Sequence, residues 1–227
     1  TRYWSFIRIW REMARAGKLG DILQMEGEYM HYEANWDYFV DRKNGELFYG
    51  SAVAPQGRDT RPTWRYRSFK HPIFYLPHTL SPLLSIVDDR VDKVSCFGSR
   101  MGSYQTPGLE VRDLETALMH TFRGTILKVS AGFTTPHGGR SGTWAHWYNV
   151  IGTKGSVEWN RSTLDKPKQY TLQDGWSEQD WTTEEQQADE FIKSSGHGGA
   201  DYYPIDPFVR AILDDTTPPM GLYRAVE

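Results

Sequence analysis

The spacing of apolar residues at the start of the chain predicts a helix followed by a strand. Between residues 4 and 16 the apolar side chains recur every three or four positions, which is the period of an amphipathic helix; they are Phe6, Ile7, Trp10, Met13 and Ala14. Gly17 and Gly20 then end the helical pattern. From residue 21 to 31 the period changes to two, which predicts a strand; its apolar or aromatic face carries Leu23, Met25, Gly27, Tyr29 and His31.

The next part of the chain shows a weaker pattern. Residues 34–63 contain several glycines and prolines without periodicity, so we expect a long irregular segment, of a kind that is often functional or mobile. Residues 64–69 predict a short strand. An apolar run then ends near residue 87 and predicts a short helix, in which Ser81 is the cap and Pro82 lies in the first turn.

Strand patterns dominate from residue 91 onward. They cover 91–99, 114–122, 125–133, 143–151, 156–160 and, more weakly, 168–173. Arg123-Gly124 predicts a tight hairpin, whereas 174–200 reads as polar. Asp206 and Pro207 predict the start of a last helix. This order of elements predicts an α+β fold, namely a large, mostly antiparallel open sheet with helices on one face.

Composition excludes several classes of protein. The 227 residues contain one cysteine, Cys96, so no internal disulfide is possible. The 26 basic and 29 acidic side chains give a net charge of −3, which excludes a strong electrostatic footprint for nucleic acid. No apolar run approaches the roughly 18 residues that a membrane span requires. We therefore expect neither a nucleic acid nor a membrane as partner.

Several sequence motifs of common enzymes are also absent. The chain contains no G-x-G-x-x-G between a strand and a helix, no P-loop, no H-E-x-x-H, no paired C-x-x-C and no G-x-S-x-G. A dinucleotide fingerprint, a dedicated zinc site and a serine nucleophile elbow therefore have no support, and we expect no metal.

The chemistry that remains lies in histidines, tyrosines and an arginine near the ends of elements. Imidazole titrates near neutral pH and a phenol can relay protons, so such a set could transfer protons on a polyol, with a guanidinium holding hydroxyl groups or a carboxylate. The candidates are Tyr29, His31, Arg65, Tyr75, His78 and His197.

Each candidate also has a structural explanation. A single ring at a strand end is commonly an amphipathic residue at the rim of the sheet, and an arginine commonly pairs with a surface carboxylate. We interpret the remaining histidines that lack a distinguishing context, and the strand tryptophans, as structural; they are His120, His137, His146, Trp144, Trp147 and Trp159.

Four segments, in register along nearly the whole chain, resemble the C-terminal domain of the Gfo/Idh/MocA oxidoreductases. These segments are 17–31 (GKLGDILQMEGEYMH), 75–84 (YLPHTLSPLL), 148–158 (YNVIGTKGSVE) and 196–203 (GHGGADYY), the last followed by a helix and Pro218-Pro219. The resemblance implies that residues 1–20 are a linker helix after a nucleotide-binding domain that lies upstream. It also implies that residues 21–227 are a substrate-binding and oligomerisation domain.

Within that family, three elements are most similar to the NAD-dependent glycosidases of glycoside hydrolase family 109. They are Tyr-x-His at 29–31, Tyr-x-Pro-His at 75–78 and Gly-His-Gly-Gly at 196–199. The resemblance implies a sugar site with His78 and Tyr29 as catalytic residues. It gives a substrate-binding role to His31, Arg65, Tyr75, Tyr148 and His197, with Arg61 and Arg67 as alternatives to Arg65.

The resemblance leaves three functions open. The first is the substrate-binding half of an NAD- or NADP-dependent oxidoreductase that acts on a sugar or cyclitol. The second is an NAD-dependent glycosidase that oxidises its sugar transiently, and the third is a non-catalytic sugar-binding or scaffold domain. The main cofactor site would lie in the upstream domain, so we expect this chain by itself neither to hold the cofactor tightly nor to turn over. We also expect a homo-oligomer formed through the open sheet face, and a cytoplasmic location, or a periplasmic one with an upstream signal.

Overall fold

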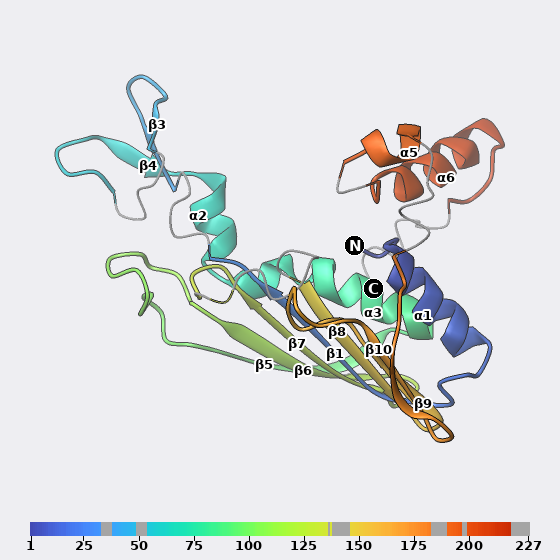
Figure 1. Ribbon diagram of the computed structural model, residues 1–227. Helices are drawn as coiled ribbons and strands as arrows, with labels where there is room; N and C mark the ends of the chain where they lie inside the picture. Colours follow the sequence, from blue (N-terminus) through green and yellow to red (C-terminus); the bar gives the residue numbers. More distant parts are fainter. Residues whose placement is uncertain are drawn as a thin grey trace.

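An open sheet of eight strands forms the centre of the protein (Figure 1). The computed structural model describes residues 1–32, 38–48, 54–135, 137, 146–182, 190–196 and 199–218. The strands run in the order β11-β10-β9-β8-β1-β7-β6-β5, and all neighbours are antiparallel except β1 and β7. Their bounds are β1 (Ile22–Met30), β5 (Val91–Gly98), β6 (Glu115–Thr121), β7 (Ile126–Gly132), β8 (His146–Gly152), β9 (Gly155–Glu158), β10 (Lys168–Thr171) and β11 (Gly175–Glu178).

The helices next to the sheet cover one of its faces, as the sequence predicts. They are α1 (Ser5–Arg15), the 3-10 helix η1 (Pro72–Tyr75) and α3 (Pro77–Val87). Phe6 and Trp10 of α1 are fully buried against the sheet with Leu83 of α3. The ring of Phe6 stacks on Trp159 with 3.8 Å between the ring centroids. The apolar stripe of α1 therefore belongs to the same core as the sheet. The α+β class with a mostly antiparallel sheet is confirmed.

A separate three-stranded sheet projects from one end of the molecule (Figure 1). It consists of β2 (Phe39–Asp41), β3 (Leu47–Phe48) and β4 (Thr60–Pro62), and α2 (Trp64–Phe69) follows it. We call residues 38–69 the arm. The predicted irregular segment over 34–63 and the predicted strand over 64–69 are therefore wrong. Strands of two or three residues and a helix of six are too short to show their period in a sequence.

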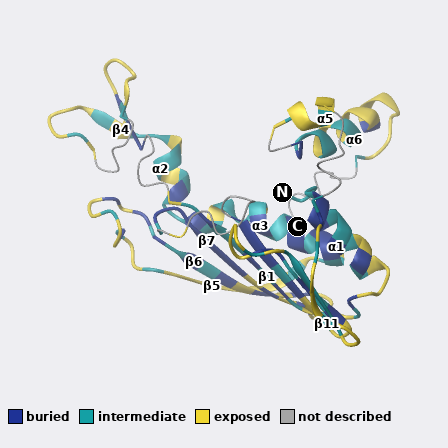
Figure 2. Ribbon diagram, in the orientation of Figure 1, coloured by how far each residue is buried: buried dark blue, intermediate teal, exposed yellow. Residues whose placement is uncertain are grey.

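A second, smaller core fixes the base of the arm to the main sheet. Its buried residues are Tyr38, Phe39, Phe69, Leu109, Val111 and Phe133. Tyr29 of β1 and Tyr75 of η1 pack against this cluster from the side of the main sheet. The boundary between the two cores thus lies at the carboxyl end of β1. Figure 2 shows that buried residues follow the central strands of the main sheet, whereas much of the arm is exposed.

Two helix starts differ from the prediction, and both involve a proline. α3 begins at Pro77 and contains Pro82 in its interior. In the same way α6 (Tyr202–Leu213) begins well before Pro207, which lies inside it. Each segment has an earlier proline, Pro77 or Pro204, that fits a first turn equally well, because backbone N–H groups there need no helical partner.

Two further differences concern the part of the chain after residue 142. The prediction missed β11 and the short helix α5 (Glu190–Ser194) within a stretch that reads as polar. The first residues of the predicted strand 143–151 lie outside the described part of the chain, and β8 begins at His146.

The predicted hairpin at Arg123-Gly124 is confirmed. Gly124 has φ +92°, and the backbone N–H of Thr121 donates to the backbone oxygen of Thr125.

Candidate functional site

Six rings gather at the carboxyl end of β1, where the two cores meet. We call Tyr29, His31, Tyr75, His78, Phe133 and His146 the ring cluster. The ring of Tyr29 is at its centre. The ring centroids of His146, His31 and His78 lie 4.2 Å, 4.6 Å and 5.1 Å from that of Tyr29. Tyr75 stacks on His78 at 5.7 Å. Three imidazoles and two phenols from three parts of the chain therefore share one location.

The strand register explains why these rings meet. Tyr29 and His31 are two residues apart on β1 and its extension, so both side chains point to the face that carries the helices. Tyr29 on β1 and His146 on β8 are direct antiparallel partners, which places their rings side by side. On the other side of Tyr29, the parallel partner on β7 is Ala131, whose small side chain leaves room for a ring.

A glycine brings α3 close enough for His78 to join. Gly27 lies on the same face as Tyr29, two residues before it, and is buried. A methyl group at position 27 would overlap Cγ2 of Thr79, and it would also lie 3.3 Å from Leu83 Cδ1. The missing side chain thus allows the first turns of α3 to rest directly on β1. His78 precedes Thr79, so the close approach sets the distance between His78 and Tyr29.

Tyr148 of β8 forms a hydrogen bond with the backbone of His78. Its side chain is fully buried, and its hydroxyl donates a hydrogen bond of 2.9 Å to the backbone oxygen of His78. That oxygen would normally accept from the N–H of residue 82, but Pro82 has no N–H. The same hydroxyl lies 3.3 Å from Nδ1 of His146. Burial, and next the neighbouring Tyr29 phenol, raise the pKa of Tyr148 well above its ordinary value, so Tyr148 stays a neutral donor.

A buried carboxylate holds the other ring-bearing element, η1. Glu115 of β6 is 5% exposed and accepts the backbone N–H of Ile73 at 3.1 Å. Its other oxygen lies 3.1 Å from Nδ1 of His71 and 3.3 Å from Nε of Arg112. Glu115 therefore fixes η1 on the sheet, and η1 ends with Tyr75.

Asp113 anchors the loop beside Phe133. It is 6% exposed and accepts hydrogen bonds from the hydroxyls of Ser103 and Thr134 and from the backbone N–H of Tyr104. Burial by itself raises the pKa of Asp113, but these hydrogen bonds outweigh it and lower the pKa below its ordinary value. Thr134 directly follows Phe133, so this network holds one wall of the ring cluster.

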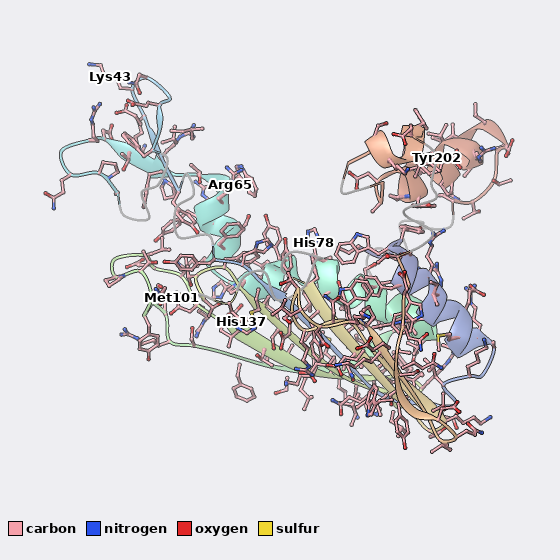
Figure 3. All side chains as sticks on the ribbon, viewed as in Figure 1. Lys43, Arg65, His78, Met101, His137 and Tyr202 are labelled. Atoms are coloured by element: carbon pink, nitrogen blue, oxygen red, sulfur yellow. The ribbon has the colours of Figure 1, made fainter. Side chains whose placement is uncertain are left out.

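Arg65 stands at the base of the arm, next to the ring cluster. Figure 3 shows it on α2, on the side of the sheet that also carries His78. Burial raises the pKa of Tyr75, and the positive charge of Arg65 acts in the opposite direction. The guanidinium carbon of Arg65 lies 4.8 Å from the ring centroid of Trp64. The positive charge of Arg65 thus acts on one ring of the cluster, that of Tyr75.

The structure brings together four of the seven residues singled out from the sequence. Tyr29, His31, Tyr75 and His78 are all half-buried and in mutual ring contact, and Arg65 is adjacent. Tyr148 is fully buried, and its hydroxyl donates to the backbone oxygen of His78. His197 lies outside the described residues. Of the two alternatives to Arg65, Arg61 is on β4 and Arg67 is on α2, and both are exposed.

His146 belongs to the ring cluster, although its sequence context gave no sign of it. It is 6% exposed, between the rings of Tyr29 and Trp4. Only the pairing of β1 with β8 places it there, and that pairing joins segments more than 100 residues apart. His120 and His137 lie elsewhere, 3.7 Å from Asp92 and 3.9 Å from Glu28 respectively.

The donor set of the ring cluster suits proton transfer and hydroxyl recognition. Neutral imidazole both donates and accepts hydrogen bonds, and it takes up a proton near neutral pH. In the described part of the chain, no group of three or more histidine, cysteine or acidic side chains is placed to hold a metal ion. No helix among the described residues is long and apolar enough to cross a membrane.

Comparison with known proteins places the chain among oxidoreductases. A family model described as "Oxidoreductase family, C-terminal alpha/beta domain" (Gfo/Idh/MocA) matches residues 11–227. No curated protein matches the sequence significantly.

Several solved structures share the fold at low sequence identity. An oxidoreductase from Agrobacterium radiobacter, in complex with NAD+, L-tartaric acid and magnesium, is 12% identical with a TM-score of 0.60, over 96% of this chain and 54% of that one. A levoglucosan dehydrogenase in complex with NADH and L-sorbose is 15% identical with a TM-score of 0.60, over 95% and 56%. An inositol dehydrogenase homolog from Azotobacter vinelandii, complexed with NAD+, is 14% identical with a TM-score of 0.52, over 87% and 43%. The chain thus spans about half the length of these proteins.

Proposed function

The chain belongs to the Gfo/Idh/MocA oxidoreductase family, as its C-terminal alpha/beta domain, and we propose that it forms the substrate-binding part of an NAD(P)-dependent enzyme that oxidises a sugar or cyclitol. The observation that carries this proposal is the ring cluster, in which three imidazoles surround one phenol at distances of 4.2–5.1 Å between ring centroids. The dinucleotide would be held mainly by the further length that the solved relatives have beyond the matched domain.

The residues of the ring cluster fit the proton half of such a reaction. Oxidation of a secondary alcohol removes a hydride from carbon and a proton from oxygen; the nicotinamide, when bound, supplies the hydride acceptor. His78 is half-buried at the start of α3, and as neutral imidazole it accepts the hydroxyl proton. The product is the ketone, and His78 returns the proton to solvent.

The other residues bind and orient the substrate. Tyr29 and His31 donate hydrogen bonds to, and accept them from, neighbouring hydroxyl groups of the sugar or cyclitol, as recognition of a polyol requires. Arg65 offers a fork of donors next to Tyr75. Tyr148 has no direct role with the substrate in this proposal; it keeps His78 in place through the backbone oxygen. His197 remains a proposed substrate ligand on sequence grounds alone.

A glycosidase reaction through transient oxidation is the second candidate. It requires two separate acid–base groups, because after oxidation by the His78 route a second base must abstract the proton next to the new carbonyl. Tyr29 would be that base, since its ring lies 5.1 Å from His78 yet belongs to a different element. The leaving group then departs, water adds, and the carbonyl is reduced again, so the cofactor returns to its starting state.

One experiment separates the candidates. The full-length protein would be incubated with NAD+ or NADP+ and with free sugars, cyclitols or an aryl glycoside. Steady formation of reduced cofactor indicates the dehydrogenase, whereas release of the aglycone without net reduction indicates the glycosidase. Binding of the sugar with neither reaction, in the presence of either cofactor, would contradict both and favour a non-catalytic sugar-binding domain.

We further propose that the uncovered sheet face joins copies of the chain. This face carries exposed apolar side chains on neighbouring strands, among them Phe97 of β5 and Leu118 of β6, which are 78% and 54% exposed. Burying such side chains stabilises association. Light scattering after size exclusion would test the proposal. We expect Leu118→Glu to lower the oligomeric mass, and an unchanged mass would count against this face.

A further inference from the structure

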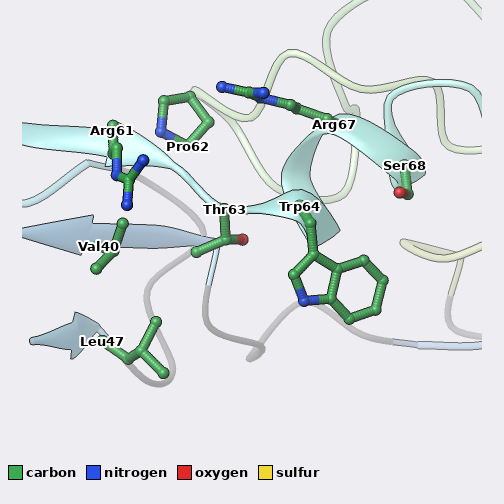
Figure 4. Close-up of a pocket in the computed structure, with 8 residues that line it drawn as sticks. All are labelled: Val40, Leu47, Arg61, Pro62, Thr63, Trp64, Arg67 and Ser68. Carbon is green, nitrogen blue, oxygen red and sulfur yellow. The ribbon is translucent and has the colours of Figure 1, made fainter. Parts of the chain in front are cut away.

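The arm contains a pocket of its own, outside the ring cluster. It has a volume of about 490 Å³, and Figure 4 shows the side chains that line it. They come from the three strands of the arm and from α2, and they include Val40, Leu47, Arg61, Trp64 and Arg67. A volume of several hundred Å³ suits a ligand of the size of one or two sugar rings rather than a lone ion.

Among the described residues, the pocket carries two positive charges without an acidic side chain in its lining. The described part of the arm has six basic and three acidic side chains. Two of the three carboxylates form ion pairs with other arginines. Asp59 Oδ1 lies 3.4 Å from Arg42 Nε, and Asp41 Oδ2 lies 3.6 Å from Arg58 Nη1. Neither Arg61 nor Arg67 has an ion pair or hydrogen-bond partner for its side chain within the described ranges, and no acidic residue lines the pocket. Two guanidinium groups are therefore available to an anion.

The pocket also offers an aromatic surface. The side chain of Trp64 is 58% exposed, which is a large apolar area to leave in water. Arg65 lies over the indole at 4.8 Å from the ring centroid and can occupy only one of its two faces. The exposed part of the Trp64 side chain can therefore pack against the C–H groups of a sugar ring. Leu47, 52% exposed, adds a second apolar contact.

We propose that this pocket binds a sugar ring that carries an acidic group, either a carboxylate or a sulfate. Trp64 packs against the ring, and Arg61 and Arg67 bind the acid through charge-assisted hydrogen bonds. The aromatic surface argues against inorganic anions alone, and the paired arginines argue against a neutral sugar.

The position of the pocket connects it with the ring cluster. Trp64 and Arg67 of the pocket share α2 with Arg65, whose charge reaches Tyr75. A substrate of two or more sugar units could therefore have its reacting ring at Tyr29 and His78 and its acidic ring in the arm. This last step rests on the proposed function, whereas binding in the arm does not.

The test uses ¹⁵N-labelled chain without cofactor, so that binding is measured independently of any oxidation. The nine tryptophans each give an indole N–H signal in the NMR spectrum, and Trp64→Phe identifies the one from Trp64. The probes are methyl glucuronide, glucose 6-sulfate and, as the neutral control, methyl glucoside. We expect saturable shifts of the Trp64 signal with an acidic probe and none with the neutral one; which acid binds more tightly distinguishes carboxylate from sulfate.

Charge-neutral variants then test the arginines. Arg61→Gln and Arg67→Gln should each weaken binding about threefold to fivefold, as expected for one exposed charge pair, and high salt should do the same. Lys43→Gln, which removes one positive charge at the tip of the arm (Figure 3), is the matched control and should bind normally.

Three results would overturn the proposal. They are the absence of any shift at Trp64 with both acidic probes, an equal response to the neutral glucoside, and equal binding by the Arg61, Arg67 and Lys43 variants. A Trp64 signal that moves with protein concentration alone would show that the pocket is instead a contact between copies. Lack of oxidoreductase activity in the full-length protein would leave the Trp64 shifts unchanged, so the two proposals fail separately.

Discussion

The hydroxyl of Tyr148 takes the place of the hydrogen-bond donor that Pro82 cannot supply to the backbone oxygen of His78. The distance from the hydroxyl to that oxygen is 2.9 Å, and Pro82 is the residue four positions after His78 in α3. A side chain of the sheet thus completes the helix, and it does so at the residue proposed to accept the proton. This relationship ties the position of His78 to β8 as well as to its own helix.

Tyr148→Phe should lower the free energy of unfolding by about 1–2 kcal/mol, because a covered carbonyl loses its partner. In a Pro82→Ala background the alanine N–H can serve that carbonyl, so the same substitution should cost less than about 0.5 kcal/mol. Urea unfolding of the four proteins of this double-mutant cycle measures the difference. Equal losses in both backgrounds would mean that Tyr148 does not compensate for Pro82.

Gly27→Ala should destabilise the chain by about 1–3 kcal/mol, because the added methyl group overlaps Cγ2 of Thr79 in a closely packed site. Thr79→Ser removes that methyl group, so Gly27→Ala with Thr79→Ser should regain much of the loss. The unfolding midpoint in urea provides the measurement. If the double variant is no more stable than Gly27→Ala alone, the close approach of α3 to β1 is not the cause.

Asp113 should make the stability of the chain depend on acid pH. Its pKa is lowered in the folded chain, so its contribution is complete above the unfolded value of about 3.9 and is lost as the pH falls through the lower folded value. Asp113→Asn should therefore lower stability at neutral pH and flatten the loss of stability between about pH 5 and pH 2. Thermal unfolding across this range tests both effects. Asp21→Asn, at an exposed carboxyl group, serves as the control, and a wild-type slope in Asp113→Asn would contradict the assignment.

His78→Ala in the full-length protein should reduce turnover about 10²–10⁴-fold, the usual contribution of a positioned acid–base group. The Michaelis constant should change much less, since Tyr29, His31 and Arg65 remain to bind the substrate. Formation of reduced cofactor at saturating substrate measures this. His120→Ala, at a histidine beside Asp92 and away from the rings, is the matched control. Activity near wild type in His78→Ala would remove that residue from the role.

Where the sequence has long periodic segments, its prediction of the fold succeeded. The helix over residues 4–16, the strand over 21–31 and the hairpin at residues 123–124 are all present, because each has enough residues to display its period or a turn that requires glycine. The arm was missed because its strands have only two or three residues each, too few to display a period. They are stabilised by pairing with one another and by the second core, in which Phe39 is buried and against which Phe48 packs.

The candidate site was predictable as far as its residues lie close together in the chain. The pairs Tyr29–His31 and Tyr75–His78 could be found because each occupies one short segment with the residue types of proton transfer. His146, Glu115 and Asp113 could not be found in this way. Their contacts depend on which strands pair and on which side chains become buried. Neither property can be read from the sequence by itself.

The two ends of the arm's strands meet at one hydrogen bond, from Thr63 N–H to the Tyr38 oxygen, 2.8 Å long. A segment that leaves and re-enters a framework at a single place can be exchanged between relatives without disturbing the rest of the protein. Chimeras that swap residues 40–62 but keep Phe48, and so retain the side chains that pack in the second core, should therefore fold as well as their parents. In evolution, such an attachment would let recognition diversify as a module while the sheet and its proton-transfer residues stayed the same.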